Sequence, residues 1–246
     1  MPVLAAAFAS LGLTAPTGQQ PCLQAGGGGS VQAPVFVRNH SGQTSWFASP
    51  VVADLDGDGS NELVVAYYDV FIYSSTGALL DVADDGEGRV YAPHVVADLD
   101  GNGTTEVVVG RGHQVIAFEW TGTQLQVKAG WPADTTTGGN PPEVRGMAAA
   151  DLDGDGSIEI VVTTTQTVPT ADGGAQVFVF DADGADYQPA GGHVPAWPRY
   201  NNLPGPGNDA DRNGPGHSGF GCYGLNVGIG DIDDDPAQEI IVTYDN

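Results

Sequence analysis

The chain has 246 residues with 31 Asp and Glu against only 7 Lys and Arg, so its formal net charge is −24. We therefore expect neither nucleic acid nor an anionic membrane as a partner, because contact with phosphate requires clustered cations. The length allows one or two domains, and its 37 Gly and 17 Pro alternate with runs of Val and Ile, which favours an ordered all-β protein.

The N-terminal part differs in composition from the rest. Residues 1–13 are largely apolar and resemble the core of a secretion signal, although no Lys or Arg precedes them. This run is too short to span a bilayer, so we expect no membrane insertion. Residues 24–30 read as a flexible glycine-rich linker. We thus expect a signal-like segment and linker over 1–30 and a folded region over 31–246. Cys22 and Cys222 allow one disulfide, and two unpaired thiols are equally compatible with the sequence.

Four loops of the folded region share one pattern of oxygen-bearing side chains. They cover residues 54–63, 98–107, 151–160 and 231–240, and each has carboxylates or an amide at positions 1, 3, 5 and 9. Alternate residues of a tight loop can turn toward one point, and hard oxygen ligands suit Ca²⁺. A Gly at position 6 permits positive φ, which lets the position 7 carbonyl join the cage. The predicted side-chain ligands are Asp54, Asp56, Asp58 and Glu62; Asp98, Asp100, Asn102 and Glu106; Asp151, Asp153, Asp155 and Glu159; Asp231, Asp233, Asp235 and Glu239.

The residues around these loops exclude an EF-hand, which closes with Glu at position 12 and lies between helices. Here position 12 is Val65, Val109, Val162 or Val242. The flanks, such as 50–53 and 62–68, are rich in β-branched and aromatic residues and show no helical period. The pattern predicts a strand, a calcium loop and a second strand.

The predicted strands follow the same order around each loop. A strand candidate over 33–37 precedes the first loop, and each loop is preceded by one strand and followed by others. The expected following strands cover 62–68, 69–73 and 78–82; 106–110, 114–118 and 124–127; 159–163 and 175–180. The loop starts at 54, 98, 151 and 231 are 44, 53 and 80 residues apart. Units of four strands at about 40–50 residues are typical of propeller blades, and a linear solenoid is the alternative.

These units resemble the FG-GAP and VCBS repeats, the calcium-binding blades of the integrin α-subunit propeller and of secreted bacterial proteins. The resemblance implies side-chain ligation at positions 1, 3, 5 and 9, and carbonyl ligation at position 7 by Ser60, Thr104, Ser157 and Ala237. Asn102 removes one charge from the second loop and should weaken that site. Pro236 replaces the position 6 Gly of the last loop and fixes its φ, so a fourth calcium site is doubtful. The resemblance also implies a seven-bladed propeller. The chain would then hold about three complete blades and part of a fourth, with further blades from a missing C-terminal part or another chain.

The period breaks over an expected inserted loop at 187–221. It contains aromatic and amide side chains suited to a sugar, yet Trp197-Pro198 resembles Trp131-Pro132, which favours an inter-blade packing role for the tryptophan. No catalytic constellation stands out, and His94 and His113 fit packing or surface roles.

The sequence therefore predicts a secreted, calcium-rigidified propeller that serves as an extracellular interaction or adhesion module for a protein or glycan ligand. The alternative is part of a secreted calcium-dependent polysaccharide lyase or hydrolase, with His193, Arg199 and His217 as candidate residues.

Overall fold

The computed structural model describes residues 33–40, 47–84, 86–136, 141–165, 177–187, 223–233 and 238–245. The regular structure of these residues is entirely β-strand, and no described helix is long and apolar enough to cross a membrane. The chain divides into two units, Met1–Asn39 and His40–Asn246, and every strand belongs to the second. The all-β prediction is confirmed.

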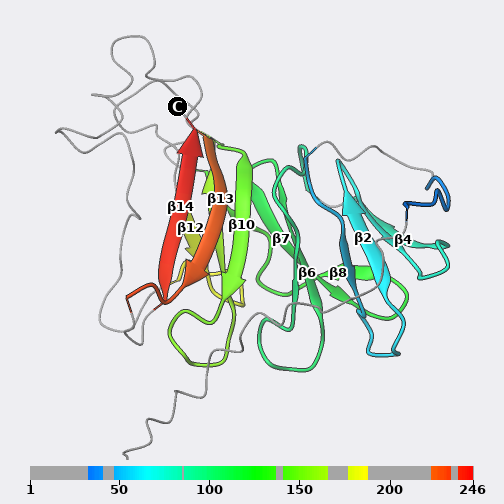
Figure 1. Ribbon diagram of the computed structural model, residues 1–246. Helices are drawn as coiled ribbons and strands as arrows, with labels where there is room; N and C mark the ends of the chain where they lie inside the picture. The colour runs from blue at the N-terminus through cyan, green and yellow to red at the C-terminus, as the bar shows by residue number, and fades with distance from the viewer. Residues whose placement is uncertain are drawn as a thin grey trace, which may run out of the picture. The chain divides into compact units, whose positions relative to one another are not determined.

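The strands form four antiparallel sheets (Figure 1). The first contains β1 (Val51–Ala53), β2 (Glu62–Ala66), β3 (Val70–Tyr73) and β4 (Leu79–Ala83) in that order. The second contains β5 (Val95–Ala97), β6 (Glu106–Arg111), β7 (Gln114–Trp120) and β8 (Leu125–Val127), with β9 (Ala133–Asp134) also paired to β7. The third contains β10 (Val144–Ala150), β11 (Glu159–Thr164) and β12 (Val177–Phe180), and the fourth contains β13 (Tyr223–Gly230) and β14 (Glu239–Asp245).

Consecutive sheets pack on one another through apolar side chains, with one core between each pair of neighbours. In β6, Val107 and Val109 pack with Val64 of the first sheet, while Val108 packs with Val162 of the third. Successive side chains of a strand point to opposite faces, so β6 is covered on both sides and buried along its whole length. A third core joins the third and fourth sheets and includes Val161.

Most strands lie within two residues of their expected ranges. The predicted strand over 33–37 is wrong: residues 33–40 carry no strand, and Val35, Phe36 and Val37 are 82, 75 and 80% exposed. No described strand pairs with this segment, and Pro34 has no N–H to donate to a ladder. Strand β9 was not predicted, since two residues are too few to show a period.

Trp131 joins the second and third sheets, as the packing prediction for Trp131-Pro132 requires. Its indole Nε1–H donates to the carbonyl of Ala182 at 3.1 Å, and its ring meets Phe180 edge-on with centroids 6.3 Å apart. The peptide bond to Pro132 is cis. Trp197, the two cysteines and residues 188–221 lie outside the described residues.

Candidate metal centre

Each acidic loop connects the first two strands of its sheet, as predicted: β1 to β2, β5 to β6, β10 to β11, and β13 to β14. In the first three loops the glycines at positions 4 and 6 all have φ between 70° and 96°. Glycine adopts this conformation without steric cost, which lets the chain fold back on itself. The positive φ expected at position 6 is confirmed, and Pro236 lies outside the described residues.

The carboxylates also hold the loop backbone. Asp54 at position 1 accepts from the N–H of Asp58 at 3.1 Å and from the N–H of Gly59 at 2.9 Å. Asp98 and Asp151 accept the same two bonds in the second and third loops. The position 5 side chain in turn accepts from the N–H of position 7, which is Ser60, Thr104 or Ser157. These bonds orient several carboxylates inward before any ion is considered.

The glutamate at position 9 has a role that the sequence analysis missed. In all four loops its Oε2 accepts from the backbone N–H of position 2, at 3.0 Å for Glu62, 2.8 Å for Glu106, 2.6 Å for Glu159 and 2.7 Å for Glu239. The bond ties the start of the loop to the following strand. The sequence contains one hint of this bond, because every loop with Glu at position 9 also has Leu or Ile at position 2.

Four groups of carboxylates come close enough to share one cation, with ligand oxygens within 4.8 Å of one another. They are Asp54, Asp56 and Asp58; Asp98, Asp100 and Glu106; Asp151, Asp153 and Glu159; and Asp231, Asp233 and Glu239. The first group contains Asp58 in place of Glu62. Asp235 and Ala237 of the fourth loop lie outside the described residues. The donors are all hard oxygens, so these groups suit Ca²⁺ by ligand type.

The third loop is the most favourable of these groups on electrostatic grounds. Glu159 is 2% exposed, and burial raises the pKa of its carboxyl to about 7, with a further increase from the charges of Asp153 and Asp155. The Leu152 N–H bond opposes the increase without cancelling it. A cation placed here would relieve this repulsion.

The second loop differs because a lysine lies among its carboxylates. The Nζ of Lys128, the residue after β8, is 2.6 Å from Asp100 Oδ2, 3.3 Å from Glu106 Oε1 and 3.3 Å from Glu119 Oε1. Burial by itself would lower the pKa of Lys128, but its hydrogen bond to Asp100 and the charge of Glu106 outweigh burial and raise it. The Lys128 hydrogen bond in turn lowers the pKa of Asp100. The residues of this loop therefore do not fit a metal ion as those of the third loop do.

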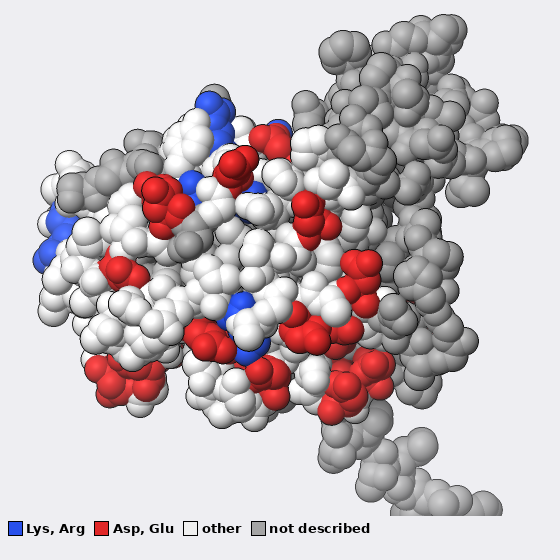
Figure 2. Space-filling model, turned by 180° about the vertical axis from the view of Figure 1, so that it is seen from behind, with Lys and Arg blue, Asp and Glu red and all other residues white. Residues whose placement is uncertain are grey.

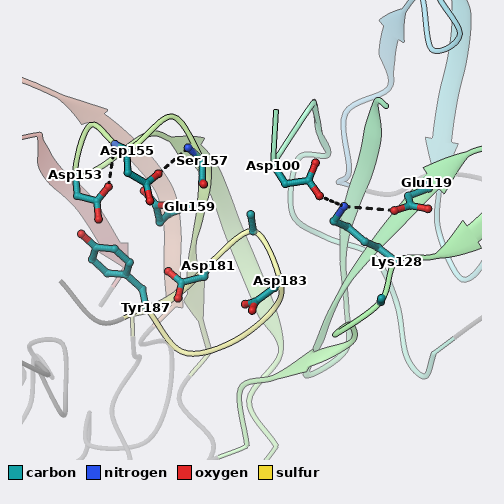
Figure 3. Close-up of a pocket in the computed structure, with 12 residues that line it drawn as sticks. Asp100, Glu119, Lys128, Asp153, Asp155, Ser157, Glu159, Asp181, Asp183 and Tyr187 are labelled. Carbon is teal, nitrogen blue, oxygen red and sulfur yellow. Dashed lines mark hydrogen bonds and ion pairs between the residues drawn. The ribbon is translucent and has the colours of Figure 1, made fainter. Parts of the chain in front are cut away.

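A pocket of about 600 Å³ lies where the second and third loops meet (Figure 3). Asp153, Asp155 and Glu159 line it with Asp181 and Tyr187 from the third sheet, and Lys128 lines it from the second. The N–H of Ile158 donates to the carbonyl of Leu99 at 2.8 Å, which links the two loops directly. Figure 2 shows that acidic side chains far outnumber basic ones over one face of the described surface.

Comparison with known proteins matches part of this arrangement to a family. Residues 98–162, from the start of the second loop to the middle of β11, match the model of the FG-GAP-like repeat. This segment is an FG-GAP-like repeat. The matched segment thus includes the second loop, the third loop and the strands β6 to β10 that follow the one and precede the other.

Among solved structures, the chain is similar to the V. cholerae biofilm matrix protein Bap1. The two share 17% identity with a TM-score of 0.39, over 80% of this chain and 35% of that chain. The present chain thus spans about a third of the length of that structure. No curated protein matches the chain.

The sequence analysis named three candidate residues for the enzymatic alternative. His193, Arg199 and His217 lie outside the described residues. His94 is 7% exposed, and burial lowers its pKa to about 4, so it is a neutral core residue at neutral pH. His113 lies at the turn between β6 and β7, with Nε2 4.0 Å from Asp134 Oδ2.

Proposed function

We propose that the chain is a calcium-binding β-propeller module that acts outside the cell in adhesion. The observation that carries this proposal is the recurrence of one acidic hairpin loop at the same place in four successive sheets. In a propeller each blade is one sheet, so the same hairpin is expected at the same place in every sheet. The FG-GAP-like repeat over 98–162 agrees with it.

In this proposal the four sheets are consecutive blades. The support is that separate cores follow one another along the chain. Val107 and Val109 of β6 lie in the core between the first and second sheets, and Val108 lies in the core between the second and third. Further blades, from a longer chain or from another molecule, would complete the ring. A crystal structure of the natural protein in which the sheets form a linear stack and not a ring would contradict the proposed propeller.

Calcium would act on stability, since bound Ca²⁺ neutralises carboxylates that otherwise repel one another. Asp151, Asp153 and Glu159 would hold it in the third loop, and Asp54, Asp56 and Asp58 in the first. Each group is already oriented by backbone N–H donors, so the loops lose little freedom when an ion binds. A ligand that binds only the folded state adds its binding free energy to stability, about 1.4 kcal/mol per site at a concentration tenfold above Kd.

Scanning calorimetry of the full chain in millimolar Ca²⁺ and in excess chelator tests this role. We expect the chelator to lower the melting temperature by roughly 3–6 °C per occupied site. Magnesium at equal ionic strength is the control, because it demands a smaller octahedral cage. An unchanged melting temperature in chelator would contradict the proposal.

An extracellular location follows from the same chemistry. Loops that bind calcium at about 10⁻⁴ to 10⁻³ M, the range of extracellular calcium modules, fill only where calcium is millimolar, and we propose this range here. Fractionation of the source cells checks this, and recovery of the protein in the cytosol alone would contradict it.

For the partner we propose a glycan, which would contact an arginine and tyrosine cluster at the strand ends opposite the acidic loops. Arg89 donates to the Tyr68 hydroxyl at 2.7 Å and to the Tyr91 hydroxyl at 3.2 Å, and the Arg145 guanidinium lies 3.9 Å from the centroid of the Tyr91 ring. Half-buried rings with adjacent donors suit the faces and hydroxyls of sugars.

Binding to immobilised glycans with and without Tyr91→Ala tests the surface, with Tyr187→Ala as the control at the other end of the sheets. Selective loss in Tyr91→Ala, with an unchanged melting temperature, is expected. Two results would contradict the proposal: the unaltered chain binds a protein ligand but no glycan, or both variants lose glycan binding equally.

A further inference from the structure

We propose that Lys128 is a built-in cation that replaces calcium in the second loop, so that this hairpin is closed without metal while the third requires it. The inference rests on the proposed calcium-binding function. It concerns a residue outside the second loop, whose ligand positions 1, 3, 5 and 9 differ from those of the third loop only at Asn102.

Few carboxylate oxygens of the second loop remain for an ion. In the second loop Asp100 Oδ1 accepts from the N–H of Asn102, and Glu106 Oε2 accepts from the N–H of Leu99. The remaining oxygens, Asp100 Oδ2 and Glu106 Oε1, are the two that Lys128 Nζ contacts. The ammonium thus takes the oxygens of positions 3 and 9 that an ion would need.

The charge count of the loop agrees with this assignment. Position 5 is Asn102 in the second loop and Asp155 in the third, so the second loop has one carboxylate fewer. Lys128 adds one positive charge and is 7% exposed, which places that charge inside the cluster. Glu106, which is fully buried, gains a cationic partner that it would otherwise lack. A divalent cation in the same cluster would have to displace the ammonium from Asp100 Oδ2 and Glu106 Oε1.

The third sheet supplies an internal comparison, because its matching residue is not cationic. The N–H of Lys128 donates to the carbonyl of Ala117, and the N–H of Tyr187 donates to that of Val179. Ala117 pairs with Val108, two residues after Glu106, and Val179 pairs with Val161, two residues after Glu159. Tyr187 therefore occupies the place of Lys128 beside the third loop (Figure 3). Glu119 pairs with Glu106, and Asp181 follows Phe180, which pairs with the residue after Glu159. The two sites therefore differ in the ammonium and at position 5.

Calcium titration of the full chain by isothermal calorimetry tests this difference. We expect Asp98→Asn to leave the number of bound calcium ions unchanged and Asp151→Asn to remove one. Loss of one ion in both variants would overturn the Lys128 inference and leave the proposed function standing. No calcium binding in the unaltered chain would instead overturn the proposed function.

Lys128→Met supplies the second test, with Tyr187→Met as the matched control in the third sheet. In chelator, Lys128→Met should melt at a lower temperature than the unaltered chain, because three carboxylates lose their cation. Added calcium should restore most of the difference and raise the stoichiometry by one, whereas Tyr187→Met should gain no ion. If Lys128→Met does not fold even in calcium, or folds without gaining an ion, the inference is wrong.

Discussion

A single carboxylate at position 9 serves the loop with one oxygen and faces the cluster with the other. Glu159 Oε2 accepts from Leu152 N–H at 2.6 Å, and the same carboxylate has an oxygen within 4.8 Å of oxygens of Asp151 and Asp153. Replacement by Gln would keep an acceptor for the N–H while removing the charge. The backbone role and the metal role can therefore be separated by one substitution.

We expect Glu159→Gln to be neutral or stabilising in chelator, since it removes a buried charge that its neighbours repel. In calcium it should lose most of the increment that the metal gives to the unaltered chain, about 1 kcal/mol or more. Denaturant unfolding in both conditions measures the two values. Equal calcium stabilisation of variant and parent would show that Glu159 does not ligate.

At the scale of the residue, His94 should also affect how stability depends on pH. Neither of its ring nitrogens has a hydrogen-bond partner among the described residues, and burial lowers its pKa from 6.5 to about 4. Because the folded-state pKa is lowered, the stabilising contribution of the neutral ring is complete above pH 6.5 and is lost as the pH falls toward 4.

His94→Leu should therefore flatten the dependence of unfolding free energy on pH. Between pH 7.5 and 4.5 we expect the parent to lose about 2–3 kcal/mol more than the variant, because the leucine has no proton to gain. Urea unfolding at both pH values measures this difference, and contributions from the carboxylates are shared and cancel. Identical pH profiles for the two proteins would contradict the buried, neutral histidine.

At the scale of the element, the turn before Trp131 depends on a glycine. Gly130 has φ of 92°, and a Cβ built there would overlap the carbonyl oxygen of Asp183 in the third sheet. Gly122, in the turn between β7 and β8, has φ of 85° with nothing within 4 Å of such a Cβ. The two glycines share a positive φ and differ in the space around them.

Gly122→Ala should cost only the strain of positive φ, about 1–2 kcal/mol. Gly130→Ala should cost at least about 2 kcal/mol more, because the chain must also move away from Asp183. Thermal unfolding of both variants gives the comparison. Equal losses would show that the contact between the second and third sheets at Gly130 is not tight.

At the scale of the whole molecule, the sheets are joined in series by separate cores and a few polar bonds. Asp81 Oδ2 accepts from the N–H of Leu125 at 2.7 Å between the first and second sheets, and Trp131 joins the second to the third. Each sheet thus depends on its neighbours, as in other repeat arrays.

Trp131→Ala should lower the free energy of unfolding by about 3–5 kcal/mol, since it leaves a cavity in the core between two sheets. We also expect the unaltered chain to melt in one transition and the variant in two, as the second and third sheets uncouple. Calorimetry gives both results, with the partly exposed Val127→Ala as a control. A loss below about 1 kcal/mol with one sharp transition would contradict this coupling.

The amino-acid sequence alone determined the features whose causes are local. Each acidic loop holds its candidate ligands within nine residues, and its strands carry β-branched residues, so loop positions and most strand bounds could be predicted from the order of side chains. The strand expected over 33–37 failed because strand formation requires a neighbour, and propensity does not supply one.

Only the tertiary structure decided which residues meet across the chain. Lys128 reaches Asp100 from 28 residues away, and Trp131 reaches Ala182 from 51 residues away. Asn102 at position 5 shows that the second loop has one carboxylate fewer, but the local sequence does not reveal that an ammonium closes the loop. Closure by the ammonium depends on where β8 ends after the sheet has formed, because charge neutralisation depends on distance in space and not on position along the chain.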